Sequence, residues 1–342
     1  MTENQKEQHQ RSKYDKLYKP IVFIPFLIFI FCIIYMISFY NTNHDFFYKD
    51  ISLKGGTSVT IYHPVNINDL SSYLSQNFKD FNVREISDLR TGKQEAVIVE
   101  VSESSEVVKS SLEKYLNFTL TNENSSIEFT GSSIGSGFYK QALFSILLAF
   151  LFMGMVIFLI FAKGWKIKGL IMILSLIPLI LFINKVPINK LFYVILIDLV
   201  ICMFIYFRHN MPSFFIILCA FLDIFMTLTF VNILGIKVST AGIIAFLMLI
   251  GYSVDSDILL TTRVLREQEG TVNERIFSAF KTGIIMATTT LAAVIVSLLV
   301  TKNFSAVLKQ IFTILTIGLF LDIMNTWITN ASLIKYYAER KK

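Results

Sequence analysis

The sequence predicts a polytopic α-helical membrane protein that carries one α+β domain outside the membrane. Hydrophobic residues make up 54% of the 342 residues, whereas a soluble domain has roughly 45–50%. They are concentrated in runs long enough to cross a bilayer, which takes about 20 residues per helix. Only one sizeable polar block interrupts these runs, at residues 44–136.

The apolar runs predict about eight membrane spans. The first lies at 21–43, after a polar lead at 1–20, and is too long for a cleaved signal sequence, so we expect an uncleaved anchor. About seven further spans follow within 137–336, and a short tail ends the chain at 337–342. The most apolar stretches are 21–40, 140–161, 169–184, 190–207, 214–235, 239–260, 279–300 and 311–332.

The third and fourth stretches, within 163–207, are short for membrane helices. They form either two thin spans or one re-entrant pair. Both alternatives leave an even number of crossings, so we expect both termini on the same side of the membrane.

The distribution of basic residues predicts which side that is. Lysine and arginine are concentrated in the polar lead, in the loop 162–168, after residue 207, at 263–275 and at the C-terminus, whereas the loops 232–238 and 301–310 hold one and two lysines. The positive-inside rule therefore places both termini in the cytoplasm and residues 44–136 outside the cytoplasmic membrane. We expect contact with membrane lipid. We expect no nucleic-acid partner, because no soluble domain carries a basic face.

The polar block has the pattern of a small α+β domain. Alternating apolar residues predict strands, and apolar residues at helical spacing predict helices. Their order is strand, helix, strand, strand, helix, strand, which is typical of the ferredoxin-like fold. The expected segments are 57–63, 70–78, 83–89, 96–101, 105–116 and 126–130.

Enzymatic and cofactor motifs are absent from the sequence. It contains no phosphate-binding loop, no HExxH and no G-x-S-x-G pattern. The three cysteines, Cys32, Cys202 and Cys219, all lie in apolar runs, and the four histidines are scattered without metal-ligand spacing. We therefore expect neither an enzyme nor a bound cofactor or metal.

Five acidic residues interrupt the predicted spans: Asp198, Asp223, Asp255, Asp257 and Asp322. A charged side chain at the bilayer centre costs at least about 2.5–3.5 kcal/mol on insertion scales. Two explanations are open, namely a proton relay that couples ion flow to motion, or hydrogen bonding between helices. Asp255 and Asp257 point about 200° apart on a helix, so one is expected to face the core and the other a partner chain.

Two further features accompany these acids. Arg263 lies near the predicted cytoplasmic end of its helix and is either a positive-inside anchor or a part of the coupling site. Ala279, Gly283 and Ala287 form a stripe of small residues, which favours close packing of this helix against its neighbours.

Asp50, Gly55, Gly56 and Thr57 form a D-x-x-x-x-G-G-T pattern at the start of the polar block. This pattern resembles the entry of the external domain in the SecD/SecF family, in particular its archaeal SecF branch. The segments 211–224, 249–263 and 322–327 also resemble that family.

The resemblance implies half of an RND-type transporter bundle and a function in protein export. It further implies pairing with SecD, association with the Sec translocon, contact with the translocating polypeptide and use of the proton gradient, with coupling roles for Asp223 and Arg263. The chain departs from the family at two places. The acid near residue 255 is displaced by one position, and 163–207 resembles an inserted apolar pair, so Asp198 within it inherits no function.

The alternative function is that of a small-molecule or lipid exporter of the RND or MMPL type. Such exporters usually hold two halves in one chain, whereas this chain has one external domain and one half-bundle. An intramembrane enzyme ranks last, because no catalytic set is recognisable in the sequence.

Overall fold

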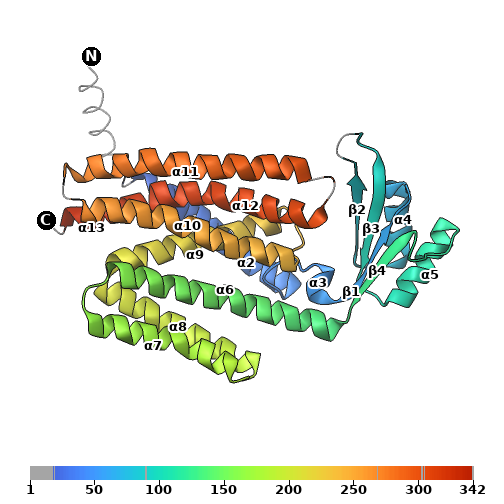
Figure 1. Ribbon diagram of the computed structural model, residues 1–342, viewed down its shortest axis with the longest axis horizontal. Helices are drawn as coiled ribbons and strands as arrows, with labels where there is room; N and C mark the ends of the chain where they lie inside the picture. The colour runs from blue at the N-terminus through green and yellow to red at the C-terminus, as the bar shows by residue number, and fades with distance from the viewer. Residues whose placement is uncertain are drawn as a thin grey trace, which may run out of the picture.

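The computed structural model describes residues 18, 20–88, 91–267, 269–301, 303 and 305–340. The predicted cytoplasmic lead, apart from Tyr18 and Pro20, and the last two lysines lie outside these residues. The described chain forms a helical bundle with an α+β domain at one end (Figure 1).

Among the described residues, eight helices are long and apolar enough to cross a membrane, as the sequence predicts. The last of them, Ala306–Arg340, is one span built from α12, the π-helix η1 and α13. The bundle elements are α2 (Phe23–Asn43), α6 (Ser132–Phe161), α7 (Trp165–Ile183), α8 (Ile188–His209), α9 (Met211–Ile233), α10 (Thr240–Arg266), α11 (Val272–Thr301), α12 (Ala306–Met324), η1 (Asn325–Asn330) and α13 (Ala331–Arg340).

Helices α9 and α10 form the centre of the bundle. Their most apolar stretches are 61% and 56% buried within the chain, against 17–39% for the other spans. The outer helices therefore leave much apolar surface free for lipid or for a partner, as expected where the solvent is a bilayer.

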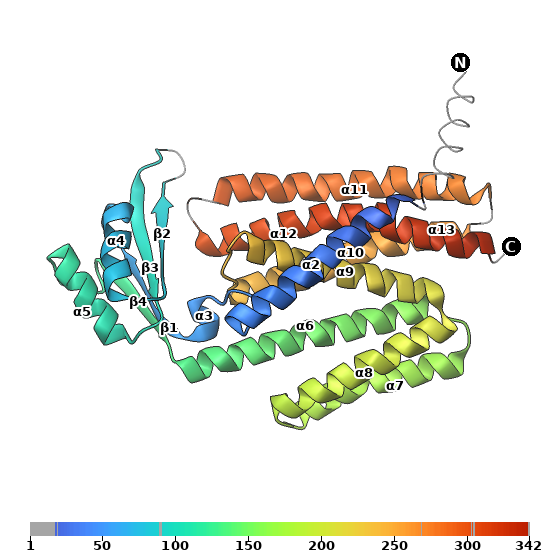
Figure 2. The ribbon, with the colours of Figure 1, turned by 180° about the vertical axis from the view of Figure 1, so that it is seen from behind.

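The segment predicted as a thin or re-entrant pair forms a hairpin of two helices, α7 and α8. They have 19 and 22 residues, which corresponds to about 28 and 33 Å of helix. Each is therefore long enough to cross the hydrocarbon core. The hairpin packs beside α6, away from α11 and α12 (Figures 1 and 2).

The α+β domain has the predicted ferredoxin-like order. Its antiparallel sheet has the strand order β2-β3-β1-β4, and helices α4 and α5 cover the face turned away from the bundle (Figure 1). Apolar side chains of the sheet and both helices form its core. The elements are β1 (Gly56–Ile61), α4 (Ile67–Asn77), β2 (Phe81–Ser87), β3 (Gln94–Val101), α5 (Ser105–Leu116) and β4 (Ser125–Thr130).

A glycine pair joins this domain to the bundle. Gly55 and Gly56, which follow the short helix α3 (Ile51–Lys54), have φ angles of +90° and +145°. A Cβ atom on Gly55 would lie 2.5 Å from Cα of Ser132, at the start of α6. Both the backbone angle and this close approach therefore require glycine. Thr57 follows, and its buried hydroxyl donates to the carbonyl oxygen of Glu103 at 2.7 Å.

The two described ends of the chain meet at the end of the bundle that lies away from the domain (Figure 2). The Tyr18 hydroxyl donates to Glu339 at 3.3 Å, and its ring lies 4.5 Å from the buried Lys335 ammonium. Lys335 also donates to Asn273 Oδ1 at 2.6 Å. The first and last spans and α11 are thus tied together at this end.

Candidate functional site

Three acidic side chains are buried in the centre of the bundle. Asp223 of α9 and Asp257 of α10 have no exposed surface, and Asp322 of α12 is 2% exposed. The carboxyl group of Asp322 lies close enough to the other two for their charges to interact. Neighbouring helices therefore bring together acids that lie up to a hundred residues apart in sequence.

Neutral donors hold the Asp223 carboxylate. Ser253 Oγ donates to one carboxylate oxygen, and Asn325 Nδ2 donates to the other at 2.6 Å. Both donors are fully buried. The pairing satisfies the two carboxylate oxygens without supplying a positive charge.

The other two acids have similar neutral partners. Asn330 Nδ2 donates to Asp257 Oδ1 at 2.8 Å, and Thr326 Oγ1 donates to Asp322 Oδ1 at 3.3 Å. Asp257 Oδ2 is buried and has no hydrogen-bond partner among the described residues.

A π-helical segment places the amide donors. Residues Asn325–Asn330 form η1, in which hydrogen bonds join residues five apart, so Asn325 and Asn330 reach the same side of the helix. In this way the same helical segment supplies one donor, Asn325, to Asp223 and a second donor, Asn330, to Asp257. π-Helical turns inside α-helices are frequent at functional sites.

The cluster has no cationic counter-charge in the part of the chain that the structure describes. No lysine or arginine forms an ion pair with Asp223, Asp257 or Asp322 there. A carboxylate in a low-dielectric interior is costly unless it is paired or neutralised. The described residues also contain no set of three or more side chains suited to a metal ion. Within the described residues, the three buried carboxyl groups therefore have neutral hydrogen-bond donors as partners.

The remaining predicted site residues lie elsewhere. Asp255 is exposed on the opposite face of α10 from Asp257, as their spacing predicts. Arg263 does not reach the acids, because its guanidinium donates to Ser278 Oγ of α11 at 2.7 Å. Asp198 is buried within α8, in the α7–α8 hairpin, and takes no part in the cluster.

The small-residue stripe of α11 contacts the last span. Ala279 is fully buried, and Ala287 is 8% exposed. A Cβ atom on Gly283 would lie 2.4 Å from the Trp327 ring. Only glycine therefore lets the ring of η1 pack this closely against α11.

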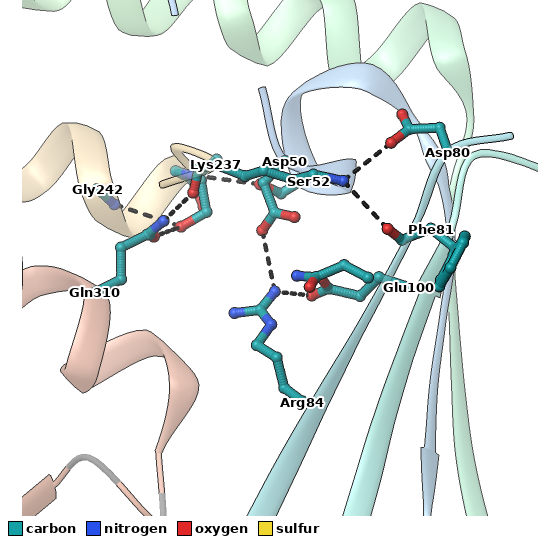
Figure 3. A network of polar contacts seen from close by, with 12 residues as sticks. Asp50, Ser52, Asp80, Phe81, Arg84, Glu100, Lys237, Gly242 and Gln310 are labelled. Atoms are coloured by element: carbon teal, nitrogen blue, oxygen red, sulfur yellow. Dashed lines mark hydrogen bonds and ion pairs between the residues drawn. The ribbon is translucent and has the colours of Figure 1, made fainter. Parts of the chain in front are cut away.

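A second polar network joins the α+β domain to the bundle (Figure 3). Lys237, in the loop between α9 and α10, donates to Asp80 Oδ1 at 2.9 Å, and Lys54 donates to Asp80 Oδ2 at 2.9 Å. Burial alone raises the pKa of Asp80, but hydrogen bonds and charge from the two lysines outweigh it and lower the pKa to about 2. The aspartate is thus ionised at neutral pH and holds the two parts together.

Asp50, at the entry to the α+β domain, belongs to the same network. Arg84 of β2 lies between Asp50, at 3.6 Å, and Glu100 of β3. Burial and the nearby Glu100 raise the pKa of Asp50, and Arg84 opposes them. Backbone bonds reinforce the contact, since the Asp50 N–H donates to the Val238 carbonyl at 2.9 Å.

Uncharged partners were missed by reasoning from sequence. Ser253, Asn325 and Asn330 complete the acid cluster, and the available signal was two asparagines five apart in an apolar span. Lys237 and Asp80 were also missed. Lys237 is the one basic residue of the loop 232–238, which is a weak signal for a contact with another domain.

Comparison with known proteins identifies similar chains. Residues 182–340 match the family model of the protein export membrane protein SecD/SecF, C-terminal. The chain is 32% identical over 327 residues to the protein-export membrane protein SecF of Methanocaldococcus jannaschii, covering 94% of this chain and 96% of the relative. It is 48% identical over 141 residues to SecF of Methanolacinia petrolearia, covering 41% of this chain and 50% of the relative.

A solved structure has a similar fold. SecDF from Thermus thermophilus, a translocon-associated membrane protein, matches with a TM-score of 0.60 at 15% identity. The match covers 94% of this chain and 38% of that protein.

Proposed function

Because the chain belongs to the SecD/SecF family of protein-export membrane proteins, we propose that it works as an accessory subunit of the Sec translocase, assisting the export of proteins across the cytoplasmic membrane. The matches to SecF proteins do not favour the alternative of a small-molecule or lipid exporter. The subunit acts by conformational change and catalyses no reaction on its substrate.

The observation that carries the coupling mechanism is the group of three buried carboxyl groups without a cationic partner in the described chain. A protonated carboxyl group tolerates the apolar core, whereas an ionised one favours a packing that admits water. Proton binding and release therefore shift the balance between two arrangements of α9, α10 and α12. The proton gradient supplies the energy for the motion of the external domain.

The exposed Asp255 supports a heteromeric partner. Its neighbours on the outer face of α10 include Tyr252, which is 39% exposed, and Met248, which is 40% exposed. A carboxyl group on an apolar face in contact with lipid is costly. A SecD subunit covers this face and gives Asp255 a polar environment.

In this proposal the α+β domain lies outside the cell and both termini lie in the cytoplasm. The meeting of the chain ends opposite the domain supports one common side for the termini. The positive-inside rule supports the cytoplasm as that side.

The proposal is tested first by purification of the tagged chain from native membranes in a mild detergent. Recovery of a SecD-like chain and of translocon subunits supports the export function. Recovery of the chain alone, as a stable homodimer, contradicts it and favours a self-sufficient exporter.

The coupling mechanism is tested with Asp223→Asn and Asp257→Asn. Both substitutions keep the size and a hydrogen-bonding group but cannot release a proton. Export of a secreted reporter should fall to the level of a strain without the protein, while the variant accumulates normally in the membrane. Asp198→Asn, a buried aspartate outside the cluster, is the matched control and should export normally. Unchanged export in both cluster variants would remove the relay from this mechanism.

A further inference from the structure

A cleft separates the edge of the α+β sheet from the bundle. Its volume is about 720 Å³, within the range of roughly 300–1,000 Å³ that is usual for ligand sites. One wall is strand β2, including Val83, Arg84 and Glu85. The other wall comes from the α9–α10 loop and the start of α12, including Lys237 and Lys309. None of these residues belongs to the acid cluster.

Strand β2 is an edge of the sheet, because the strand order is β2-β3-β1-β4. In an antiparallel pair, alternate residues direct their backbone groups toward the neighbouring strand and away from it. The Ser102 N–H donates to the Asp80 carbonyl at 3.3 Å, so even-numbered residues of this segment face β3. The odd-numbered residues therefore direct their N–H and C=O groups toward the cleft.

The bundle uses only the two ends of this edge. Lys237 Nζ donates to the Phe81 carbonyl at 3.5 Å (Figure 3), and the Ser87 N–H donates to the Asn303 carbonyl at 2.8 Å. Between them, the outward backbone groups of Val83 and Glu85 have no hydrogen-bond partner among the described residues. The N–H and C=O groups of Val83 and Glu85 thus face a cleft whose two walls are joined by a hydrogen bond at each end.

The opposite wall is fixed in place. Gln310 of α12 is 8% exposed, accepts from Ser239 Oγ and donates to the Lys237 carbonyl. Such cross-links between the α9–α10 loop and α12 keep the wall in one position. A preformed cleft loses less entropy on binding than a flexible one.

Two exposed charges of opposite sign line the cleft, Glu85 on one wall and Lys309 on the other. Arg84 pairs with Asp50 and Glu100, and Lys237 pairs with Asp80. Lys309 is exposed and has no ion pair within the described ranges. Its ammonium group is complementary to a carboxylate on the bound chain.

We propose that an extended segment of the exported polypeptide binds in this cleft by adding a strand to β2. The inference rests on the proposed export function. Main-chain hydrogen bonds supply the affinity in this mode of recognition. They are nearly independent of side-chain identity, which suits a subunit that must hold many different unfolded chains.

The test is site-specific cross-linking in membranes that hold the whole complex. Glu85→Cys places a thiol on β2, and Glu128→Cys places one on β4, the other edge of the sheet, where the side chain is also exposed. The native Cys32, Cys202 and Cys219 are all buried, so a benzophenone maleimide should label the new thiol selectively. The probe substrate is a secreted reporter whose tightly folded C-terminal domain arrests it during export.

The expected result is stronger cross-linking of the arrested reporter from position 85 than from position 128. Equal yields from the two edges would overturn the proposal, as would cross-linking from position 85 to a SecD-like subunit instead of the reporter. Export measured in the same strain separates the two hypotheses. If export requires the chain but the yields are equal, only the cleft proposal fails. If export does not require the chain, the proposed function fails as well.

A second variant tests the backbone pairing itself. Glu85→Pro removes an N–H that faces away from β3, which is tolerated in edge strands. With the cross-linker at Lys309→Cys on the opposite wall, this variant should reduce reporter cross-linking about fivefold, the effect of one hydrogen bond. Glu85→Ala, which keeps the N–H, should retain it. Equal loss in both variants would show that the side chain, and not the strand edge, recognises the polypeptide.

Discussion

Replacing Asp80 by asparagine should loosen the contact between the external domain and the bundle. Lys237 and Lys54 lower the pKa of Asp80 from its usual 3.8 to about 2, although burial opposes them. At 1.36 kcal/mol per pKa unit this corresponds to about 2.4 kcal/mol as an upper limit. The Asp80 side chain is 38% exposed, so solvent screening reduces the contribution to about 1 kcal/mol.

The pH dependence has a defined sign. Since the pKa is lower in the docked state, the contribution is fully present above the usual value of 3.8 and is lost as the pH falls through about 2. High salt should also weaken it, because the three charges are partly exposed.

Hydrogen exchange of the protein in lipid nanodiscs measures this effect. The Ser87 N–H, which donates to Asn303 across the interface, reports transient undocking. In Asp80→Asn, a loss of about 1 kcal/mol should speed its exchange about fivefold at neutral pH. Asp69→Asn, an exposed aspartate of α4, is the control and should exchange as the wild type does. Wild-type exchange in Asp80→Asn, or equal acceleration in the control, would refute the reasoning.

Two further predictions concern close backbone packing, and thermal unfolding in detergent measures both. Gly283→Leu forces the Trp327 ring away and should lower the free energy of unfolding by about 1–3 kcal/mol. Trp327→Ala in the same chain should recover part of this loss. An unchanged Tm in Gly283→Leu would contradict the close packing of the ring on α11. Gly55→Ala should cost about 1–3 kcal/mol because a Cβ atom would lie 2.5 Å from Ser132 Cα. Gly92 also has a positive φ, but no atom lies within 4 Å of the position that its Cβ would take. Gly92→Ala should therefore lower the stability less than Gly55→Ala does. Equal losses in the two variants would show that the close approach of Gly55 to Ser132 is unimportant.

Local patterns were sufficient for the elements of the fold. Runs of apolar residues predicted the spans, and alternation predicted the strands of the ferredoxin-like domain. Both patterns arise because each element must bury one face or its whole length, which is a property of a short segment. The length of α7 and α8 was the point left open, because hydropathy does not mark where a helix ends.

The sequence singled out the acidic residues of the spans but not their arrangement. Asp223, Asp257 and Asp322 do lie together, but Asp255 and Arg263 lie away from them. An acidic residue in an apolar span indicates that its side chain needs a polar environment, but it does not identify the residue that provides one. The partners are neutral, and those of Asp223 and Asp257 come from other helices, so the two asparagines of the last span gave no indication of which acid each one meets.

The sequence by itself determined that this protein spans a membrane, carries one external α+β domain and places acids in apolar helices. Each of these follows from free energies of transfer that act on one residue or one segment. Only the tertiary structure decided which acids meet, which face Asp255 occupies and how β2 borders a cleft. Those features depend on helix rotation, on the π-helical turn at Asn325–Asn330 and on the docking of two domains, all of which are set by packing between distant segments.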